Sequence, residues 1–165
     1  MKLNDPIRIM SNKPLNILNN DSTNIELAKS LIKEFEGLRL TAYFCPAGKK
    51  TIGYGHVLQG DEKHLWEITE NKAEELLDKD IIKAKSVIDE YCTSTLTHRQ
   101  EAALISFIFN CGIGAFTKST LLKKLNEEDY KGAANEFNRW INVGGVKLKG
   151  LVRRRLTERN LFLNR

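Results

Sequence analysis

Cysteine is scarce in this sequence, and its spacing does not suggest a metal site. The three cysteines, Cys45, Cys92 and Cys111, are odd in number, and no two of them form a Cys-x-x-Cys pair. Their number argues against a disulfide framework and their spacing against a zinc site, so the sequence predicts neither a metal nor a cofactor. Cys92 and Cys111 fall in apolar helical stretches, where we expect small core residues.

Long apolar runs are also missing. No stretch approaches the roughly 18 consecutive apolar residues that suggest a membrane-spanning helix. Residues 1–6 show no apolar core of a secretory signal. The sequence therefore predicts no stable membrane insertion. It also predicts a product that stays in the cytoplasm of the cell that makes it until another agent releases it.

The chain has no excess of acidic residues, because 26 Lys and Arg residues face 21 Asp and Glu residues, which gives a net charge of +5. This balance favours an anionic partner such as a nucleic acid, a membrane surface or an acidic cell-wall polymer. A soluble protein with a moderately basic surface has the same balance. The sequence contains no recognition-helix motif and no basic stripe interleaved with aromatic residues, which argues against nucleic acid.

Helical and strand-like patterns alternate along most of the chain. Residues 1–21 are rich in Asn without a sustained period, which predicts an N-terminal extension. Capping boxes at Thr23 and Thr97 mark two helix starts. The expected elements are a helix from Thr23 to Glu36, strands at 38–44 and 51–57 and near Leu58, and helices from Thr69, from Thr97 to Cys111, and around 119–125, 129–141 and 151–161. The predicted class is α+β and mostly helical, with a helix-plus-hairpin lobe at 22–92, a helical lobe at 93–165 and a ligand-binding cleft between them.

Glu36 is a candidate general acid on physical grounds. It falls in the last turn of the first helix, where the macrodipole disfavours a carboxylate relative to its protonated form. Phe35 beside it suggests partial burial. A protonated carboxylic acid is what a glycosidase uses to protonate its leaving oxygen. The alternative is an exposed helix-end glutamate that Lys33 or Arg39 neutralises.

The segment from Glu36 to His56, EGLRLTAYFCPAGKKTIGYGH, resembles the active-site region of phage-type lysozymes, and most closely that of lambdoid phage endolysins. In that family a Glu is followed after eight residues by Asp or Cys, and after five more by Thr. Here the pattern falls on Glu36, Cys45 and Thr51 without gaps. The resemblance implies a lysozyme-like two-lobed domain over residues 22–165.

The resemblance also implies roles for the three spaced residues. Glu36 is expected to be the general acid, and Thr51 is expected to hold the attacking water, because a hydroxyl both donates and accepts. Cys45 stands where other members have Asp. It is therefore expected to act as a nucleophile, a thiolate stabiliser or a weak water-orienting group. A nucleophilic cysteine usually needs a base, and Lys49 and Lys50 are the nearest in sequence.

Residues 109–116 and 150–155 resemble the helical lobe of the same family. The resemblance implies that Phe109 and Asn110 line the sugar groove, and it makes Ser119 a weaker candidate for a sugar contact. The alternative for Phe109 is core packing.

Buried charge is expected at two further places. Asp80 falls on the apolar stripe of its helix and needs a partner, which His56 can supply. We favour a structural pair of these two residues over a catalytic histidine. One of Arg153, Arg154 and Arg155 is expected to reach Glu36, while the other two face solvent or cell-wall anions.

The function that the resemblance implies is hydrolysis of the β-1,4 bond between N-acetylmuramic acid and N-acetylglucosamine in bacterial peptidoglycan. Inversion is favoured, and retention through Cys45 stays open. The alternatives are a non-catalytic peptidoglycan-binding protein on the same fold, against which the intact spacing argues, and a nucleic-acid-binding protein. We expect a monomer in the host cytoplasm that reaches the wall through a holin-type permeabiliser.

Overall fold

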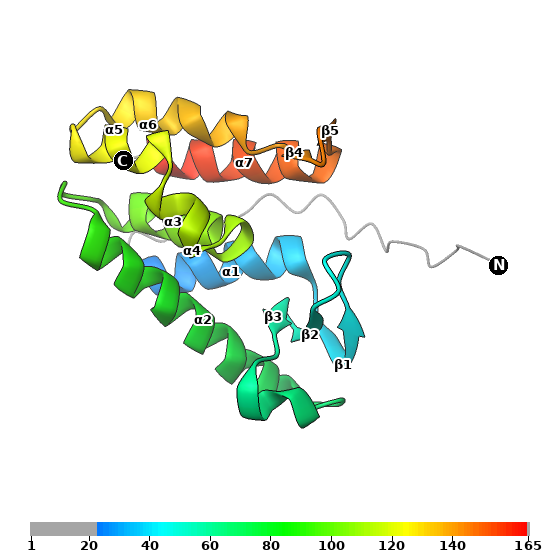
Figure 1. Cartoon of the computed structure of the whole chain (residues 1–165). Helices are drawn as coiled ribbons and strands as arrows, with labels where there is room; N and C mark the ends of the chain where they lie inside the picture. Colours follow the sequence, from blue (N-terminus) through cyan, green and yellow to red (C-terminus); the bar gives the residue numbers. More distant parts are fainter. Residues whose placement is uncertain (1–22, 165) are drawn as a thin grey trace.

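The computed structural model describes residues 23–164, so the expected extension over residues 1–21 lies outside the described residues. Within the described part, a small three-stranded sheet sits at one end of a mostly helical body (Figure 1). The described part contains no helix that is long and apolar enough to cross a membrane.

Helix α1 (Asn24–Glu36) begins and ends where the sequence predicts. The Thr23 hydroxyl accepts from the Glu26 N–H at 3.2 Å, and the Glu26 carboxylate accepts from the Thr23 N–H at 3.0 Å, which completes the capping box. Gly37 ends the helix with a φ of 67° and donates its N–H to the Lys33 carbonyl. Glu36 is therefore the last residue of α1.

The sheet has the antiparallel order β1 (Arg39–Phe44), β2 (Lys50–Gly53) and β3 (His56–Val57). The expected hairpin is present, but the expected strand over 51–57 is two strands. The chain reverses between them at Gly53 and Gly55, whose φ values are 66° and 90°. Glycine adopts this region without steric cost, and the reversal brings Gly55 next to the end of α1.

A short 3₁₀ helix, η1 (Gly60–His64), follows the sheet where the sequence gives no clear signal. The chain then runs along β1, with the Ala42 N–H bonded to the Trp66 carbonyl at 2.8 Å. A small apolar cluster lies beneath the sheet and consists of Ile52, Leu58, Ile68, Ala73 and Leu76.

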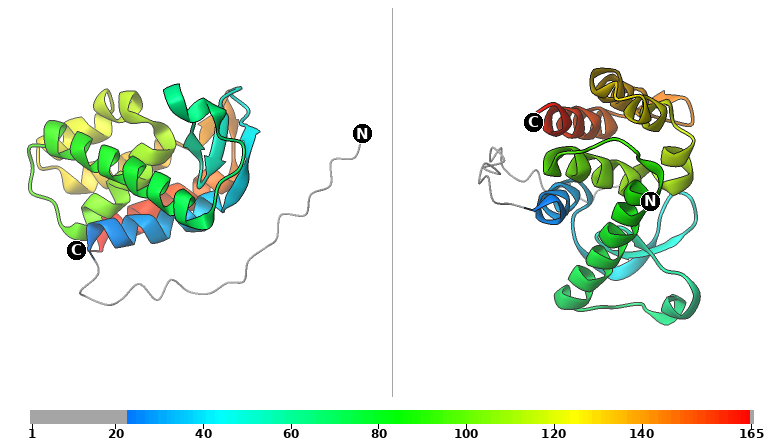
Figure 2. Two further views of the ribbon diagram at one scale, coloured as in Figure 1. Left: turned by 90° about the horizontal axis from the view of Figure 1, so that it is seen from below. Right: turned by 90° about the vertical axis from the view of Figure 1, so that its left-hand side faces the viewer.

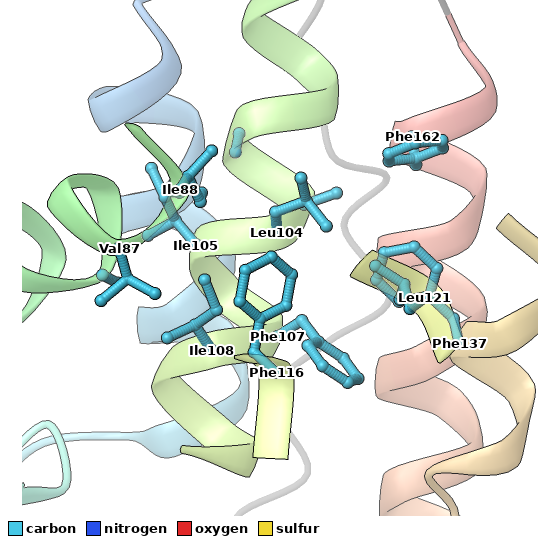
Figure 3. Close-up of a cluster of buried hydrophobic side chains, with 14 of the residues drawn as sticks. Val87, Ile88, Leu104, Ile105, Phe107, Ile108, Phe116, Leu121, Phe137 and Phe162 are labelled. Atoms are coloured by element: carbon cyan, nitrogen blue, oxygen red, sulfur yellow. The ribbon is translucent and has the colours of Figure 1, made fainter. Parts of the chain in front are cut away.

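Helix α2 (Glu70–Tyr91) starts under the sheet and leads to the helical body, where α3 (His98–Cys111) contacts α1, α2 and α7 (Figure 1; Figure 2). Nearly every residue of α3 from Ala102 to Ile108 is buried, as its uniformly apolar sequence predicts. Phe107 lies at the centre of the main core (Figure 3) and packs edge-on against Phe137. Leu27, Ala28 and Ile32 of α1 belong to this same core.

The remaining elements are α4 (Ile113–Thr117), α5 (Thr120–Asn126), α6 (Tyr130–Glu136), the 3₁₀ turn η2 (Phe137–Arg139), β4 (Asn142–Val143), β5 (Val146–Lys147) and α7 (Lys149–Leu163). The sequence reasoning missed α4 and the β4–β5 hairpin. It was also wrong to extend one helix over 129–141. Gly144 and Gly145, with φ values of 55° and 80°, form the two-residue hairpin turn. This hairpin lies at the same end of the molecule as the sheet (Figure 1; Figure 2).

Candidate active site

Glu36 lies between α7 and the turn that follows β2. Its Oε1 accepts a hydrogen bond from Arg154 Nη1. On the other side, a Cβ added at Gly55 would lie 3.2 Å from Glu36 Oε2 and 3.8 Å from Phe109 Cε1. A side chain at residue 55 would therefore crowd the carboxylate. Because Arg154 occupies Oε1, Oε2 is the oxygen that remains available to carry a proton.

Cys45 and Thr51 lie together at the turn between β1 and β2. The Cys45 N–H donates to the Lys49 carbonyl at 2.9 Å, and the buried Thr51 hydroxyl donates to the same carbonyl at 3.0 Å. A backbone hydrogen bond at Lys49 lowers the pKa of the Cys45 thiol. Burial opposes this effect, while a second backbone bond at Ala47 and the Thr51 hydroxyl add to it. The thiol is therefore easier to ionise than an ordinary cysteine.

Tyr43 connects this turn to Glu36. Burial raises the pKa of Tyr43, the Arg39 guanidinium lowers it, and the charges of Glu36 and Cys45 raise it further. Both groups therefore lie within electrostatic reach of the same phenol. Tyr43 also pairs with Thr51 across the two strands. Cys45 and Thr51 therefore lie at one strand pair, and the first strand of that pair begins three residues after Glu36.

A cavity of about 730 Å³ opens beside Glu36. Gly55 and Phe109 form its wall next to the carboxylate, and His56, Asp80 and Lys83 line it farther from Glu36. Its volume lies within the range of small-ligand sites, roughly 300–1,000 Å³. Glu36, Cys45 and Thr51 are not among the residues that line this cavity, and Gly55 and Phe109 are the lining residues that lie nearest to the Glu36 carboxylate.

The three residues predicted to bind substrate lie in different surroundings. Phe109 lines the cavity beside Gly55. Asn110 is exposed at the end of α3, and its Oδ1 accepts from Arg155 Nη2 at 3.0 Å. Ser119 is buried and caps α5: its hydroxyl accepts from the Leu122 N–H and donates to the Phe116 carbonyl. The structure does not bring Ser119 to the cavity beside Glu36. The sugar contacts of all three stay predictions.

His56 contacts two carboxylates at the cavity wall. Its Nδ1 lies 2.7 Å from Asp80 Oδ2, and its Nε2 lies 3.0 Å from Glu62 Oε2. Burial lowers the pKa of His56, but the hydrogen bonds to Asp80 and Glu62 outweigh this effect and the net shift is upward. Hydrogen bonds from Lys79 and His56 lower the pKa of Glu62 to about 2. The sequence reasoning missed Glu62, which lies in the segment without a periodic signal.

One of the three consecutive arginines on α7 does not lie where the sequence predicts. Arg154 is the residue that reaches Glu36, and Arg153 is exposed and pairs with Glu34 at 2.6 Å. Arg155, however, was expected to face solvent and is completely buried. It is buried because α7 turns it towards α3, and Glu158 of the same helix lies 2.8 Å from its Nε. The spacing of Glu158, four residues after Arg154 and three after Arg155, was the available signal.

Residues 23–164 contain no group of three or more His, Cys, Asp or Glu side chains that is arranged to hold a metal ion. The Asp80–His56–Glu62 contacts form a network in which the imidazole lies between two carboxylates, and both contacts favour its protonated form.

The chain is similar to several known proteins. The chain is 45% identical over 136 residues to an endolysin from Acyrthosiphon pisum secondary endosymbiont phage 1, covering 80% of this chain and 92% of the relative. It is also 45% identical over 137 residues to an endolysin from Bacillus phage B103, covering 81% of this chain and 51% of that relative. Its fold is similar to the muramidase domain of SpmX from Asticaccaulis excentricus, with a TM-score of 0.75 and 37% identity over 84% of this chain and 95% of that domain.

The family model described as phage lysozyme matches residues 33–158, a span that includes the described sheet and nearly all of the helical body. The match confirms the resemblance and the expected α+β, mostly helical lysozyme-like fold. The chain belongs to the phage lysozyme family, whose members are glycoside hydrolases.

Proposed function

We propose that the protein is an endolysin-type muramidase. It hydrolyses the β-1,4 bond between N-acetylmuramic acid and N-acetylglucosamine in bacterial peptidoglycan, with Glu36 as the general acid. The observation that carries the proposal is the placement of Glu36, with one oxygen bound by Arg154 and the other facing Gly55 at the cavity wall. A glycan strand in the cavity then presents its glycosidic oxygen to Glu36 Oε2, which donates a proton as the C–O bond breaks.

Thr51 and Cys45 position the water in this scheme. The Thr51 hydroxyl proton points to the Lys49 carbonyl, so the lone pairs of the hydroxyl can accept from a water. The Cys45 thiol, with its lowered pKa, offers a second acceptor in the same turn. The water oxygen attacks the anomeric carbon from the face opposite Glu36, and its proton passes to the thiolate or to solvent. This route inverts the configuration.

A turbidity assay on purified peptidoglycan tests the assignment. Glu36→Gln fills the same space but cannot donate a proton, so we expect loss of clearing with an unchanged fold. Glu34→Gln is the matched control, since Glu34 is exposed and pairs with Arg153 away from the cavity. Clearing by Glu36→Gln at the wild-type rate would contradict the proposal. Binding of the wild type without clearing would favour a non-catalytic wall-binding protein.

The family acts on the cell wall, and three finer points are proposed with it. The protein is a monomer, it does not bind nucleic acid, and it remains in the host cytoplasm until a holin-type permeabiliser gives it access to peptidoglycan. Expression with and without such a permeabiliser checks the last point. Lysis of the host in both cases would contradict it.

A further inference from the structure

We propose that Glu158 is a positioning residue that aligns both the general acid and the substrate groove, by holding Arg154 on Glu36 and Arg155 on Asn110. This role rests on the proposed function, because it assigns Glu36 and Asn110 to catalysis and binding. Glu158 has no exposed surface and does not line the cavity, so it acts through its neighbours and not on the substrate.

One oxygen of Glu158 collects three donors. Its Oε1 accepts from Ser106 Oγ at 2.7 Å, from Arg154 Nε at 3.2 Å and from Arg155 Nη2 at 3.0 Å. Ser106 belongs to α3 and the other three residues belong to α7, so the carboxylate fixes the rotation of α7 against the central helix. Charge-assisted bonds of this kind are roughly twice as strong as neutral ones.

The first set of contacts runs from Glu158 through Arg154 to Glu36, the proposed general acid. Arg154 is 3% exposed, and it uses its Nε for Glu158 and its Nη1 for Glu36. Its Nη2 donates to the Ser106 carbonyl at 3.3 Å. The rigid guanidinium fork is therefore held on two sides while its third nitrogen bonds Glu36.

The second set of contacts runs from Glu158 through Arg155 to Asn110, at the C-terminal end of α3. Arg155 is completely buried, and it donates from Nη1 to Cys111 Sγ at 2.8 Å and from Nη2 to Asn110 Oδ1 at 3.0 Å. Its guanidinium carbon lies 5.1 Å from the centre of the Phe107 ring. Glu158 thus neutralises the arginine that orients Asn110.

The contact pattern predicts different effects of two substitutions on Glu36 and on Asn110. A carboxylate with a purely structural role would not produce this difference. Among the described residues, the Ser106 side chain bonds Glu158 and Arg154, and no hydrogen bond joins it to Arg155. Loss of the Ser106 hydroxyl should therefore disturb the contact of Arg154 with Glu36 and leave the contact of Arg155 with Asn110 unchanged. Loss of the Glu158 charge should disturb both of these contacts.

Steady-state kinetics on soluble peptidoglycan strands, with thermal unfolding in parallel, test the role. Glu158→Gln should lower kcat by about tenfold or more and also raise KM. Ser106→Ala should lower kcat without changing KM. Glu136→Gln is the control, because Glu136 is a partly buried glutamate that pairs with Arg139 on the surface, and both of its constants should stay at the wild-type values.

Glu158→Asp keeps the charge and should fold even if Glu158→Gln does not. Its shorter side chain cannot hold both arginines, so we expect it to show the same two changes in weaker form. Wild-type constants per folded molecule in Ser106→Ala and Glu158→Asp would overturn the role, even if their Tm fell. An active wild type with these results would leave the proposed function intact. An inactive wild type would overturn the proposed function and this role with it.

Discussion

Arg154 and Glu36 stand 118 residues apart in the chain, and their side chains form an ion pair beside the cavity. Arg154 lies in the last helix and Glu36 ends the first described one. The ion pair therefore joins the two ends of the described chain at the site. Arg154 is almost fully buried, so loss of either carboxylate partner would leave its positive charge less well compensated.

Arg154→Lys should retain the positive charge but lose the planar guanidinium and its separate N–H donors. The three donors of an ammonium sit on one nitrogen, so they cannot replace the three separate nitrogens with which Arg154 bonds Glu158, Glu36 and Ser106. We therefore expect kcat to fall by about tenfold or more. Arg159→Lys is the control on the same helix, because Arg159 bonds Asn135 at 3.1 Å, a residue outside the cavity lining. An unchanged kcat in Arg154→Lys would show that the fork is not needed.

Asp80→Ala should destabilise the fold and spare the activity per folded molecule. The variant removes one charged hydrogen bond to His56, which costs about 1–3 kcal/mol. Glu62 remains as a second partner, so the cost is below that of an unpaired buried charge. Urea unfolding measures the change. Asp78→Ala, at a more exposed position on the same helix, should change stability less. Equal losses in both variants would remove the special status of the His56 pair.

The charge network predicts a pH window for stability. The pKa of His56 is raised above 6.5, so its contribution is complete below pH 6.5 and is lost as the pH rises through the folded-state value. The pKa of Glu62 is lowered from 4.5 to about 2, so its contribution is present above pH 4.5 and is lost as the pH falls towards 2.

The Tm difference between the wild type and His56→Gln should therefore be largest between pH 4.5 and 6.5, where both charges are present. Calorimetry across the pH range measures it. His98→Gln, at an exposed position at the start of α3, should show no such maximum. A Tm difference that is constant from acid to alkaline pH would contradict the network.

Substitutions at the turn should rank Thr51 above Cys45 in importance. Cys45→Asp should stay active and Cys45→Ser should lose part of its activity, because both still offer an acceptor. Thr51→Ala should lose more, because the hydroxyl that accepts from the attacking water is then absent. NMR of the first product anomer should show inversion. An inactive Cys45→Ser, together with a sugar adduct on the wild-type sulfur by mass spectrometry, would instead establish retention through a thioglycosyl intermediate.

Local signals were sufficient for the part of the site that lies near one helix end. The capping box at Thr23 and the glycine after Glu36 fix the length of α1, so the sequence alone places the carboxylate in the last turn. The strand pair follows from the Pro- and Gly-containing turn between its strands, with Cys45 directly after the first strand and Thr51 in the second.

Other parts of the site depend on contacts that no local pattern contains. Three consecutive arginines look equivalent in sequence, and only the rotation of α7 against α3 buries Arg154 and Arg155 while leaving Arg153 exposed. Glu62 lies in a 3₁₀ turn without a period and reaches His56 only in the folded chain. The two-residue strands β4 and β5 are too short to show an alternating pattern.

Reducing-end analysis of digested peptidoglycan tests the central claim most directly. The products are reduced with borohydride, hydrolysed and examined for the sugar alcohol. The wild type should generate new muramic-acid ends, and Glu36→Gln should generate none while Glu34→Gln matches the wild type. New glucosamine ends, no new ends from the wild type, or undiminished muramic-acid ends from Glu36→Gln would contradict a muramidase whose general acid is Glu36.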